Sequence, residues 1–416
     1  MANKIKIDVP ETPKTAPGYN NTSIKSLKGA DRVRKRPSVI FGSEGLDGCE
    51  HSFFEILSNA VDEAREGHGD IITVTAFLDH SITVDDHGRG VPLGYNEQEG
   101  RWNWDLIYCE LYAGGKYANN GAAGAYRYSL GLNGLGACAT QYSSEYMDVF
   151  SYDGVNEYSV HFEKGAVKGK GKDKLTVRPL SPKEKRTGTV VHWRPDLEVF
   201  TDIAIPHEFF IDLMRRQSVV NAGIRFVLRL EQENGSFEET FYYENGIVDY
   251  LTEKVGDSSL TAPVLWHMAE VCGRDRNDKE DYHLKADFTF CVSGTVRMLE
   301  YYHNSSFLEH GGSPDRAVRT AFLYALDRYI KDHGKYTKNE SKISFIDISD
   351  CLALVINSFS TMTSYENQTK KAITNSFICE AMTDYLKRQL EIYFIENPNE
   401  AEIFANQVLI NKRSRE

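Results

Sequence analysis

A stripe of four polar residues at helical spacing is the pattern best suited to chemistry in this chain. His51, Glu55, Asn59 and Glu63 follow one another at intervals of four, so on a helix they share one face. The positions around them are apolar: Phe53, Phe54, Ile56, Leu57, Val61 and Ala64. A solvated face usually mixes Lys with Glu, so this composition indicates a site. A carboxylate there can act as a general base, and an amide oxygen can bind a hard cation.

The first of two glycine clusters follows a predicted strand. Asp86 comes at the end of this strand, and Gly88 and Gly90 stand two and four positions further on. A carboxylate at a strand end can accept hydrogen bonds from a base while glycines let the backbone pass close to it. Asp and Gly are also favoured in ordinary turns, so for this segment alone a turn without a ligand remains an alternative.

The second cluster precedes an apolar run and consists of Gly131, Leu132, Asn133, Gly134, Leu135, Gly136 and Ala137. Its glycines can expose backbone N–H groups at the start of a helix, which suits a phosphate. The glycine order is reversed from the dinucleotide pattern G-x-G-x-x-G, and no βαβ unit follows, so a dinucleotide site is excluded. A loop without a ligand is the alternative for this segment alone. A third segment, Gly188-Thr189, opens a predicted strand, where threonine is common and says little by itself.

These residues need elements that hold them in place. The sequence predicts a helix over 47–66 that carries the stripe, and a strand pair over 71–78 and 81–84 that leads to the first glycine cluster. Further strands are expected over 146–162, 188–194, 286–301 and 342–359, a hairpin over 225–243, and helices over 314–333, 370–395 and 399–412. Because sheet and helix mix without regular βαβ spacing, the sequence predicts an α+β fold.

The composition bounds the class of protein. The chain has 416 residues, enough for two or three domains, and 41% of them are hydrophobic. Its formal net charge of −12 argues against non-specific nucleic-acid binding over the whole surface, although not against a local basic groove. We expect no membrane contact, since neither a run of about 18 apolar residues nor an apolar signal core occurs. The seven cysteines form no C-x-x-C pair, which favours a reduced, cytoplasmic protein without a zinc site or disulfide framework.

Taken in order, the motifs resemble those of the ATPases that share a fold with Hsp90, MutL and sensor histidine kinases, the GHKL (Bergerat) fold. The chain is most similar to the N-terminal ATPase and transducer region of the B subunit of DNA gyrase or of topoisomerase IV, a bacterial type IIA topoisomerase. The similarity covers roughly residues 19–412. The motifs that carry it are Ser23-Ile24-Lys25-Ser26-Leu27-Lys28-Gly29, Val33-Arg34-Lys35-Arg36-Pro37, Asn59-Ala60-Val61-Asp62-Glu63-Ala64, Ala113-Gly114-Gly115-Lys116 and Gln368-Thr369-Lys370.

The resemblance implies catalytic roles for the stripe and for the first glycine cluster. Glu55 would be the general base that orients water at the γ-phosphate of ATP, and His51 would hydrogen-bond it; a buried structural histidine is the alternative for His51. Asn59 would hold Mg²⁺; a buried amide that stabilises the helix is the alternative for this residue. Asp86 would accept the adenine amino group, with Thr189 assisting it through water. The first domain is expected to be a mixed sheet with helices on one face.

The resemblance also implies contacts to the nucleotide from elsewhere in the chain. Lys370 would be catalytic and, with Gln368, would reach the γ-phosphate from the second domain. The other implied ATP-binding residues are Tyr19, Glu63, Gly88, Gly90, Gly115, Lys116, Tyr126, Gly131, Leu132, Asn133, Gly134, Leu135, Gly136 and Ala137.

The implied organisation is an N-terminal dimerisation arm over 1–22, an ATPase domain over 23–254 and a smaller α+β transducer domain over 255–416. Tyr19 would reach the neighbouring protomer's pocket, so that ATP orders both arms and stabilises a homodimer. The implied function is a nucleotide-gated clamp that drives DNA strand passage. Its partners would be duplex DNA in the clamp cavity and the topoisomerase A subunit. The TOPRIM region that cleaves DNA is expected to be absent from this chain.

Three rival functions share parts of the pattern. A MutL-like mismatch-repair clamp shares the ATP site but not the motifs 33–37 and 368–370. A histidine kinase is disfavoured because no phosphoacceptor helix pair precedes the site. A nucleotide-binding dimeriser without catalysis would dimerise with ATP but would show no turnover dependent on Glu55. The sequence leaves the choice between gyrase and topoisomerase IV open.

Overall fold

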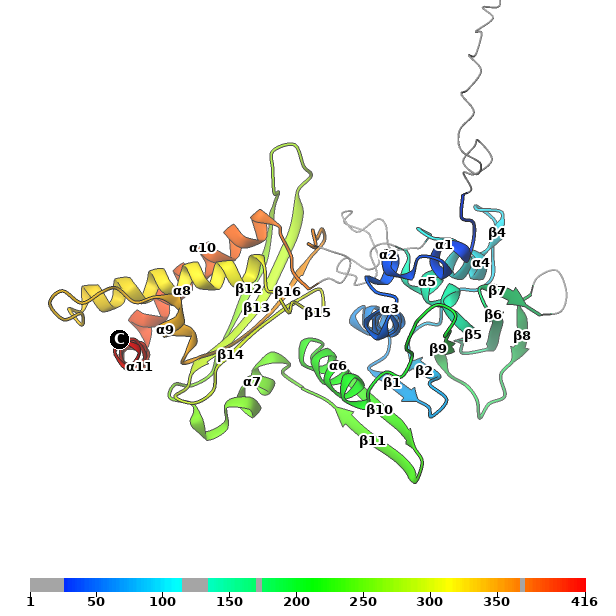
Figure 1. Cartoon of the computed structure of the whole chain (residues 1–416), viewed down its shortest axis with the longest axis horizontal. Helices are drawn as coiled ribbons and strands as arrows, with labels where there is room; N and C mark the ends of the chain where they lie inside the picture. Colours follow the sequence, from blue (N-terminus) through cyan, green and yellow to red (C-terminus); the bar gives the residue numbers. More distant parts are fainter. Residues whose placement is uncertain (1–25, 114–133, 170–173, 367–370) are drawn as a thin grey trace, which may run out of the picture.

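The computed structural model describes residues 26–113, 134–169, 174–366 and 371–416. Two large sheets organise these residues, a sheet of nine strands in the first part of the chain and a sheet of five strands in the second. Figure 1 shows the two sheets side by side, each with its own helices, and places α6 and α7 near the junction between them. The predicted mixture of sheet and helix, an α+β fold, is confirmed.

The nine-stranded sheet has the strand order β11-β10-β1-β2-β9-β5-β6-β7, with β8 paired to β6. Strands β1 and β10 pair in parallel, and the other neighbours are antiparallel. The strands are β1 (Ile71–Ala76), β2 (Ile82–Asp86), β5 (Ser144–Asp153), β6 (Asn156–Glu163), β7 (Ala166–Lys168), β8 (Thr176–Pro179), β9 (Thr187–Pro195), β10 (Arg225–Gln232) and β11 (Gly235–Phe241).

One face of this sheet carries the core of the first part. Burial alternates along β1 and β2, as expected for strands with one covered face. Helices α3 (Leu46–Arg65) and α6 (His207–Val220) supply Phe53 and Phe210 to a core that also contains Trp193 of β9. The smaller elements are α1 (Asp31–Arg34), α2 (Pro37–Phe41), β3 (Tyr95–Asn96), β4 (Arg101–Trp102), α4 (Asn103–Cys109) and α5 (Gly136–Tyr142).

The five-stranded sheet has the order β12-β13-β16-β14-β15. Its central strand β16 is buried at all nine positions because helices lie on both of its faces. The strands are β12 (Val264–Gly273), β13 (Tyr282–Val292), β14 (Met298–His303), β15 (Ser306–Phe307) and β16 (Leu352–Ser360). The helices are α7 (Ile247–Val255), a 3₁₀ turn at Gly256–Ser258, α8 (Ser313–Asp332), α9 (Phe345–Ser349), α10 (Ser376–Glu396) and α11 (Pro398–Arg415).

A hydrophobic cluster joins the two sheets through α6 and α7. Val219 and Val220, at the end of α6, pack with Leu251 of α7 and with Ala353 and Val355 of β16. The cluster therefore contains residues from both sides of position 254. The division of the chain at that position remains a prediction.

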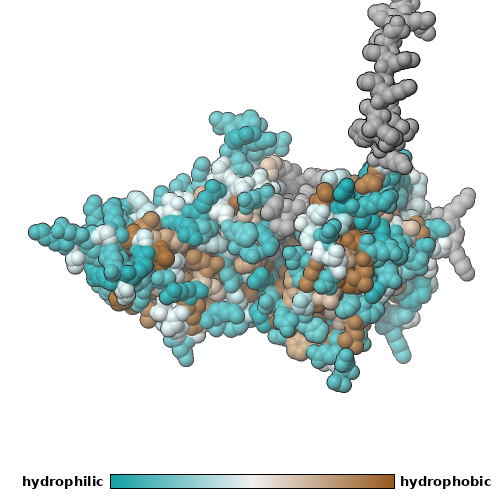
Figure 2. Space-filling view, viewed as in Figure 1, coloured by the Kyte–Doolittle hydropathy of each residue, from teal (hydrophilic) through white to brown (hydrophobic). Residues whose placement is uncertain are grey.

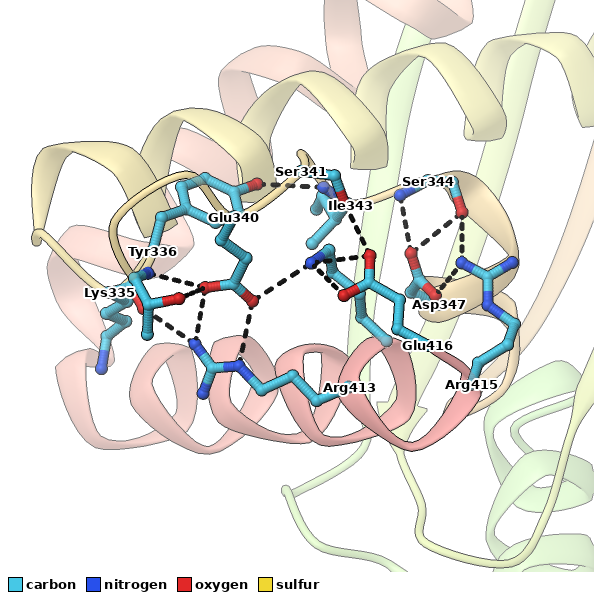
Figure 3. A network of polar contacts seen from close by, with 12 residues as sticks. Lys335, Tyr336, Glu340, Ser341, Ile343, Ser344, Asp347, Arg413, Arg415 and Glu416 are labelled. Carbon is cyan, nitrogen blue, oxygen red and sulfur yellow. Dashed lines mark hydrogen bonds and ion pairs between the residues drawn. The ribbon is translucent and has the colours of Figure 1, made fainter.

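A buried ionic network fixes the end of α11 (Figure 3). Lys412 is 1% exposed, and its Nζ lies 3.1 Å from Oε1 of Glu340. Arg413 donates from Nε and Nη2 to the same carboxylate at 2.9 and 3.0 Å. These hydrogen bonds, chiefly those from Arg413, hold the pKa of Glu340 well below its ordinary value. Arg415 adds an ion pair of 2.6 Å to Asp347 at the start of α9.

The predicted elements agree with the structure except near residues 342–375. The stripe helix and the hairpin over 225–243 are confirmed, as α3 and as β10–β11. The strand predicted over 342–359 is wrong at its start, because Ser344 and Asp347 form a capping box that begins α9. The helix predicted from 370 begins at Ser376, and strand β12 was not predicted.

Hydrophilic residues cover most of the face shown in Figure 2, with smaller hydrophobic areas among them. Exposed large apolar residues such as Val39 and Ile395 lie in different parts of the fold, which is ordinary for protein surfaces. Among the described residues, none of the helices is both long enough and apolar enough to cross a membrane.

Candidate functional site

Helix α3 places the predicted stripe on one face and pairs its first two members. Glu55 is buried, and His51, Asn59 and Glu63 are half-buried. Nε2 of His51 lies 3.1 Å from Oε1 of Glu55, and 10% of each side chain is exposed. The imidazole therefore holds one oxygen of a carboxylate that is largely shielded from bulk water, which is an arrangement suited to a general base.

Helix α5 begins against this carboxylate. A Cβ built on Gly136, the first residue of α5, would lie 2.1 Å from Oε2 of Glu55. Glycine thus lets the helix start approach Glu55 more closely than any other residue would. The first N–H groups of a helix lack acceptors within the helix, so the contact brings an end suited to anions beside the base. Gly134, Leu135 and Ala137 of the same predicted cluster are half-buried there.

Asp86 ends β2 and forms a second buried carboxylate, with 7% exposure. Its Oδ1 accepts the N–H of Gly88 at 2.8 Å and the N–H of Thr189 at 3.1 Å. None of the hydrogen bonds found for this group among the described residues involves Oδ2. Burial raises the pKa of Asp86 to about 6, although both backbone N–H groups oppose the rise.

Thr189 reaches Asp86 because glycine precedes it. Gly188 has φ of +121°, and a Cβ there would lie 2.0 Å from the carbonyl oxygen of Asp86. Strands β2 and β9 therefore meet closely at this point. Oγ1 of Thr189 accepts the N–H of Val91 at 3.1 Å, which ties the loop that contains Gly90 to β9. The backbone of Thr189 therefore contacts Asp86, whereas the contact of its hydroxyl is with Val91, and the predicted role of the hydroxyl stays a prediction.

Arg89 is a site residue that the sequence analysis missed. Its Nη2 lies 2.7 Å from Oε1 of Glu63, and its Nε lies 3.1 Å from Oε2. Gly88 is adjacent, since a Cβ there would lie 3.0 Å from the same Oε2. This two-pronged ion pair joins the end of the stripe to the first glycine cluster. The sequence did hold a signal for this pair: Arg89 stands between Gly88 and Gly90, and the polar stripe ends in a carboxylate, Glu63.

Arg186 was also missed, and it supports the end of β2. Its Nη1 lies 3.2 Å from Oδ2 of Asp85, and its Nη2 donates to the carbonyl oxygen of Asp86 at 3.0 Å. Its Cζ lies 4.7 Å from the centroid of the Tyr152 ring. The guanidinium therefore holds the strand end that carries Asp86.

The structure brings together the predicted residues of α3, of the loop after β2, of the start of α5 and of β9. The predicted residues that lie outside the described ranges are Tyr19, Gly115, Lys116, Tyr126, Gly131, Leu132, Asn133, Gln368 and Lys370. Their roles stay predictions.

The described residues on either side of 367–370 pair with each other and with the segment that precedes α8. Thr374 donates its N–H to the carbonyl oxygen of Ser364 at 2.9 Å, and the backbone N–H of Glu366 donates to the carbonyl oxygen of Ala372 at 3.0 Å. Lys371 forms an ion pair of 2.6 Å with Glu309. The residues on the two sides, 361–366 and 371–375, therefore lie next to each other; we call these two segments the base of residues 367–370.

Known proteins match this chain along nearly its whole length. A family model described as DNA gyrase B matches residues 246–416. The B subunit of the DNA gyrase of Thermotoga maritima is 26% identical over 403 residues, which are 96% of this chain and 60% of that protein. The B subunit of the DNA topoisomerase 4 of Bacillus subtilis is 30% identical over 405 residues, 96% of this chain and 58% of that protein. The chain thus spans less than two thirds of the length of these relatives.

A solved structure covers the same region of the chain. The crystal structure of the 43K ATPase domain of Thermus thermophilus gyrase B, in complex with an aminocoumarin, aligns with a TM-score of 0.69 at 25% identity. The alignment covers 94% of this chain and 96% of that chain. Both sheets and their helices therefore have counterparts in one known architecture.

Proposed function

Because the chain belongs to the family of DNA gyrase and topoisomerase IV B subunits, we propose that it binds and hydrolyses ATP as the nucleotide-gated clamp of a type II DNA topoisomerase. The observation that carries this proposal is the contact between Gly136 and the paired carboxylate of Glu55. It puts a helix start suited to phosphate next to a group suited to activate water.

The two oxygens of Glu55 have different roles in this proposal. His51 holds Oε1, while Oε2 faces the start of α5, where the γ-phosphate is proposed to lie. Oε2 then orients the attacking water and accepts its proton. Phosphoryl transfer needs positioning and charge stabilisation rather than covalent help, so the held carboxylate positions the water and other groups must stabilise the charge.

The adenine is proposed to bind at the end of β2. Asp86 keeps Oδ1 occupied by backbone donors, so Oδ2 accepts the exocyclic amino group. Its raised pKa of about 6 leaves it ionised at neutral pH, as an acceptor requires. Thr189 supports this contact through water.

The donor set fits a magnesium ion held mainly by the nucleotide. The stripe offers one amide oxygen, from Asn59, one turn away from Glu55. Among the described residues no cluster of three or more His, Cys, Asp or Glu can hold a metal by itself. Mg²⁺ commonly keeps few protein ligands and takes phosphate and water oxygens instead. When bound, it would neutralise charge on the phosphates.

The second part of the chain is proposed to complete the site. Lys370 and Gln368 would contact the γ-phosphate when residues 255–416 close onto residues 23–254, so nucleotide occupancy would set the angle between the two domains. Tyr19 and the arm over 1–22 would enter a second protomer and make dimerisation depend on ATP. The topoisomerase A subunit and duplex DNA are the proposed partners of the full-length protein.

Turnover of ATP by paired variants tests this function. We expect Glu55→Ala to bind a non-hydrolysable ATP analogue and to dimerise with it, but to lose turnover. Lys370→Ala should lose turnover as well. Glu66→Ala, at an exposed position just after α3, and Lys338→Ala, at an exposed position after α8, are the matched controls and should retain turnover. Wild-type turnover by Glu55→Ala would refute the assignment of the base, and ATP-driven dimerisation without any turnover in the wild type would favour the non-catalytic dimeriser.

A further inference from the structure

Arg65 connects the end of α3 to the second sheet. It is the last residue of α3, ten positions after Glu55 on the same helix. Its Cζ lies 4.4 Å from the centroid of the Phe359 ring, and Phe359 belongs to β16. A cation over an aromatic face at this distance is an attractive contact. A rigid helix of ten residues spans about 15 Å, so a shift at Phe359 can be transmitted to the proposed catalytic end.

The surroundings of Arg65 are poorly suited to a purely structural arginine. Its Nη1 is buried without a hydrogen-bond acceptor among the described residues. Burial, opposed by Asp62, Glu66 and Tyr365, lowers its pKa from the ordinary value. An unsatisfied buried donor reduces stability, so an apolar side chain of similar size would serve packing better.

Arg65 lies near a network of hydrogen bonds around the turn between β14 and β15. Asn304 and Ser305 form this two-residue turn with φ of 46° and 60°, as in a type I′ hairpin. His303, immediately before the turn, is fully buried, and burial together with the Arg65 charge lowers its pKa to about 3. The imidazole is therefore neutral and serves as a hydrogen-bonding node.

Residues from both parts of the chain form hydrogen bonds with this turn. Nε2 of His303 lies 3.0 Å from Oγ1 of Thr363, and Nδ2 of Asn304 donates to the same hydroxyl at 3.1 Å. From the first part, Gln217 at the end of α6 donates to the carbonyl oxygen of Ser305 at 2.9 Å. The turn thus links α6 to residues 361–366.

Residues 361–366 lead directly to the proposed phosphate contacts. Their base is closed by the bridge between Tyr365 and Ile373 and by the hydrogen bonds at Ser364 and Glu366. Arg65 packs on Phe359, two positions before this base, and Tyr365 within the base lies near enough to influence the pKa of Arg65. Helix α3 therefore carries the proposed ATP-site residues Glu55 and Asn59, and its last residue, Arg65, packs next to the base of residues 367–370.

We propose that Arg65 is a positioning residue for ATP turnover, which couples the helix carrying Glu55 and Asn59 to the base of the segment that contains Gln368 and Lys370. This inference rests on the proposed function. We infer that the orientation of residues 361–366 and 371–375 relative to α3 depends on the guanidinium of Arg65, which packs on Phe359. The nucleotide pocket itself does not include Arg65.

Arg65→Leu tests the coupling in the full chain, with Arg215→Leu as the matched control. Arg215 lies on α6 with its Cζ 5.5 Å from the Phe241 ring, within the first part of the chain. We expect Arg65→Leu to lower kcat by at least about tenfold, since misplacement of about 1 Å at a reacting group can cost about a hundredfold. Its affinity for a non-hydrolysable ATP analogue should stay within about twofold of wild type, and its Tm should not fall. Arg65→Lys keeps the charge but loses the planar stack, so its kcat should lie between the two.

Hydrogen exchange supplies a readout that does not depend on turnover. In wild type the analogue should protect residues 361–366 and 371–375, and Arg65→Leu should lose this protection while Arg215→Leu keeps it. A wild-type kcat with wild-type protection in Arg65→Leu would overturn the proposal. Equal losses of kcat, analogue affinity and Tm would also overturn it, because they would mark a structural role.

Failure of the proposed function gives a different pattern. In that case Glu55→Ala turns over like the wild type, or the wild type binds no analogue. If Glu55→Ala is inactive while Arg65→Leu matches the wild type, only the coupling by Arg65 is refuted.

Discussion

Gly136→Ala provides a sharp test of the site, because it separates helix stability from chemistry. Gly136 is the first residue of α5 and its φ is not in the left-handed region. Alanine is the better helix former by about 1 kcal/mol. By local backbone physics alone, the substitution should be harmless.

The site geometry predicts the opposite for activity. The new Cβ would lie 2.1 Å from Oε2 of Glu55, whereas ordinary van der Waals contact begins at 3.4 Å, so the carboxylate must move by about 1.3 Å. The Cβ of Glu55 at 2.9 Å is also too close, so rotation of the carboxylate alone does not relieve the overlap. Because His51 holds Oε1 at 3.1 Å, the movement stretches that hydrogen bond. Displacement of a reacting group by about 1 Å predicts a fall in kcat of about a hundredfold.

The assay is steady-state phosphate release, with analogue binding by calorimetry and a thermal melt on the same samples. We expect kcat to fall much further than analogue affinity, with only a modest fall in Tm, since overpacking typically costs about 1–3 kcal/mol and the better helix propensity of alanine offsets part of it. Gly94→Ala is the control, since a Cβ at that position meets nothing within 4 Å. If Gly136→Ala turns over within about twofold of the wild type, Glu55 is not held where the proposed mechanism requires it.

Two further substitutions concern buried charge. Asp86→Asn keeps an oxygen for the N–H groups of Gly88 and Thr189 but removes the buried charge, so at pH 8 it should raise the free energy of unfolding by about 1–3 kcal/mol while weakening binding of adenine nucleotides. The folded pKa of Asp86 is raised from 3.8 to about 6, so its contribution to the free energy of unfolding is fully present below pH 3.8 and is lost as pH rises through 6. In urea titrations, the difference in stability between Asp86→Asn and wild type should therefore vanish as pH falls from 6 to 3.8. A variant no more stable than the wild type at pH 8 would contradict the assignment. Glu340→Gln weakens the hydrogen bonds to buried Lys412 and to Arg413 and should lower the free energy of unfolding by about 1–3 kcal/mol, whereas Glu416→Gln, at a side chain that is 52% exposed, should have a much smaller effect. The folded pKa of Glu340 is lowered, so its contribution to the free energy of unfolding is present above its ordinary pKa of 4.5 and is lost as pH falls below that value. Equal losses of stability in the two Gln variants at pH 7 would show that the burial of Lys412 does not affect stability.

Local sequence determined the elements that carry the site. The spacing of His51, Glu55, Asn59 and Glu63 on an apolar helix required one polar face, and α3 presents it. Hairpin β10–β11 followed in the same way from alternation and an Asn-Gly turn. These are features of near neighbours, for which helical or strand periodicity suffices.

Local pattern failed where a few side chains overrode it. Residues 342–349 are β-branched enough to predict a strand, but the capping box of Ser344 and Asp347 starts α9 instead. The sequence analysis assigned no role to Arg89 or Arg186. Their roles depend on Glu63 and Asp85, carboxylates that the fold brings to them from other segments.

Only the tertiary structure decided how separate segments meet. That Gly136 touches Glu55, that Gly188 lets β9 reach Asp86, and that Arg65 packs on Phe359 involve residues many positions apart, brought together by sheet order and helix packing. The sequence alone identified the chemical groups, because residue types and helical or strand periodicity can be read from neighbouring positions. Their distances depend on close packing between segments, where a single Cβ decides whether two groups can touch.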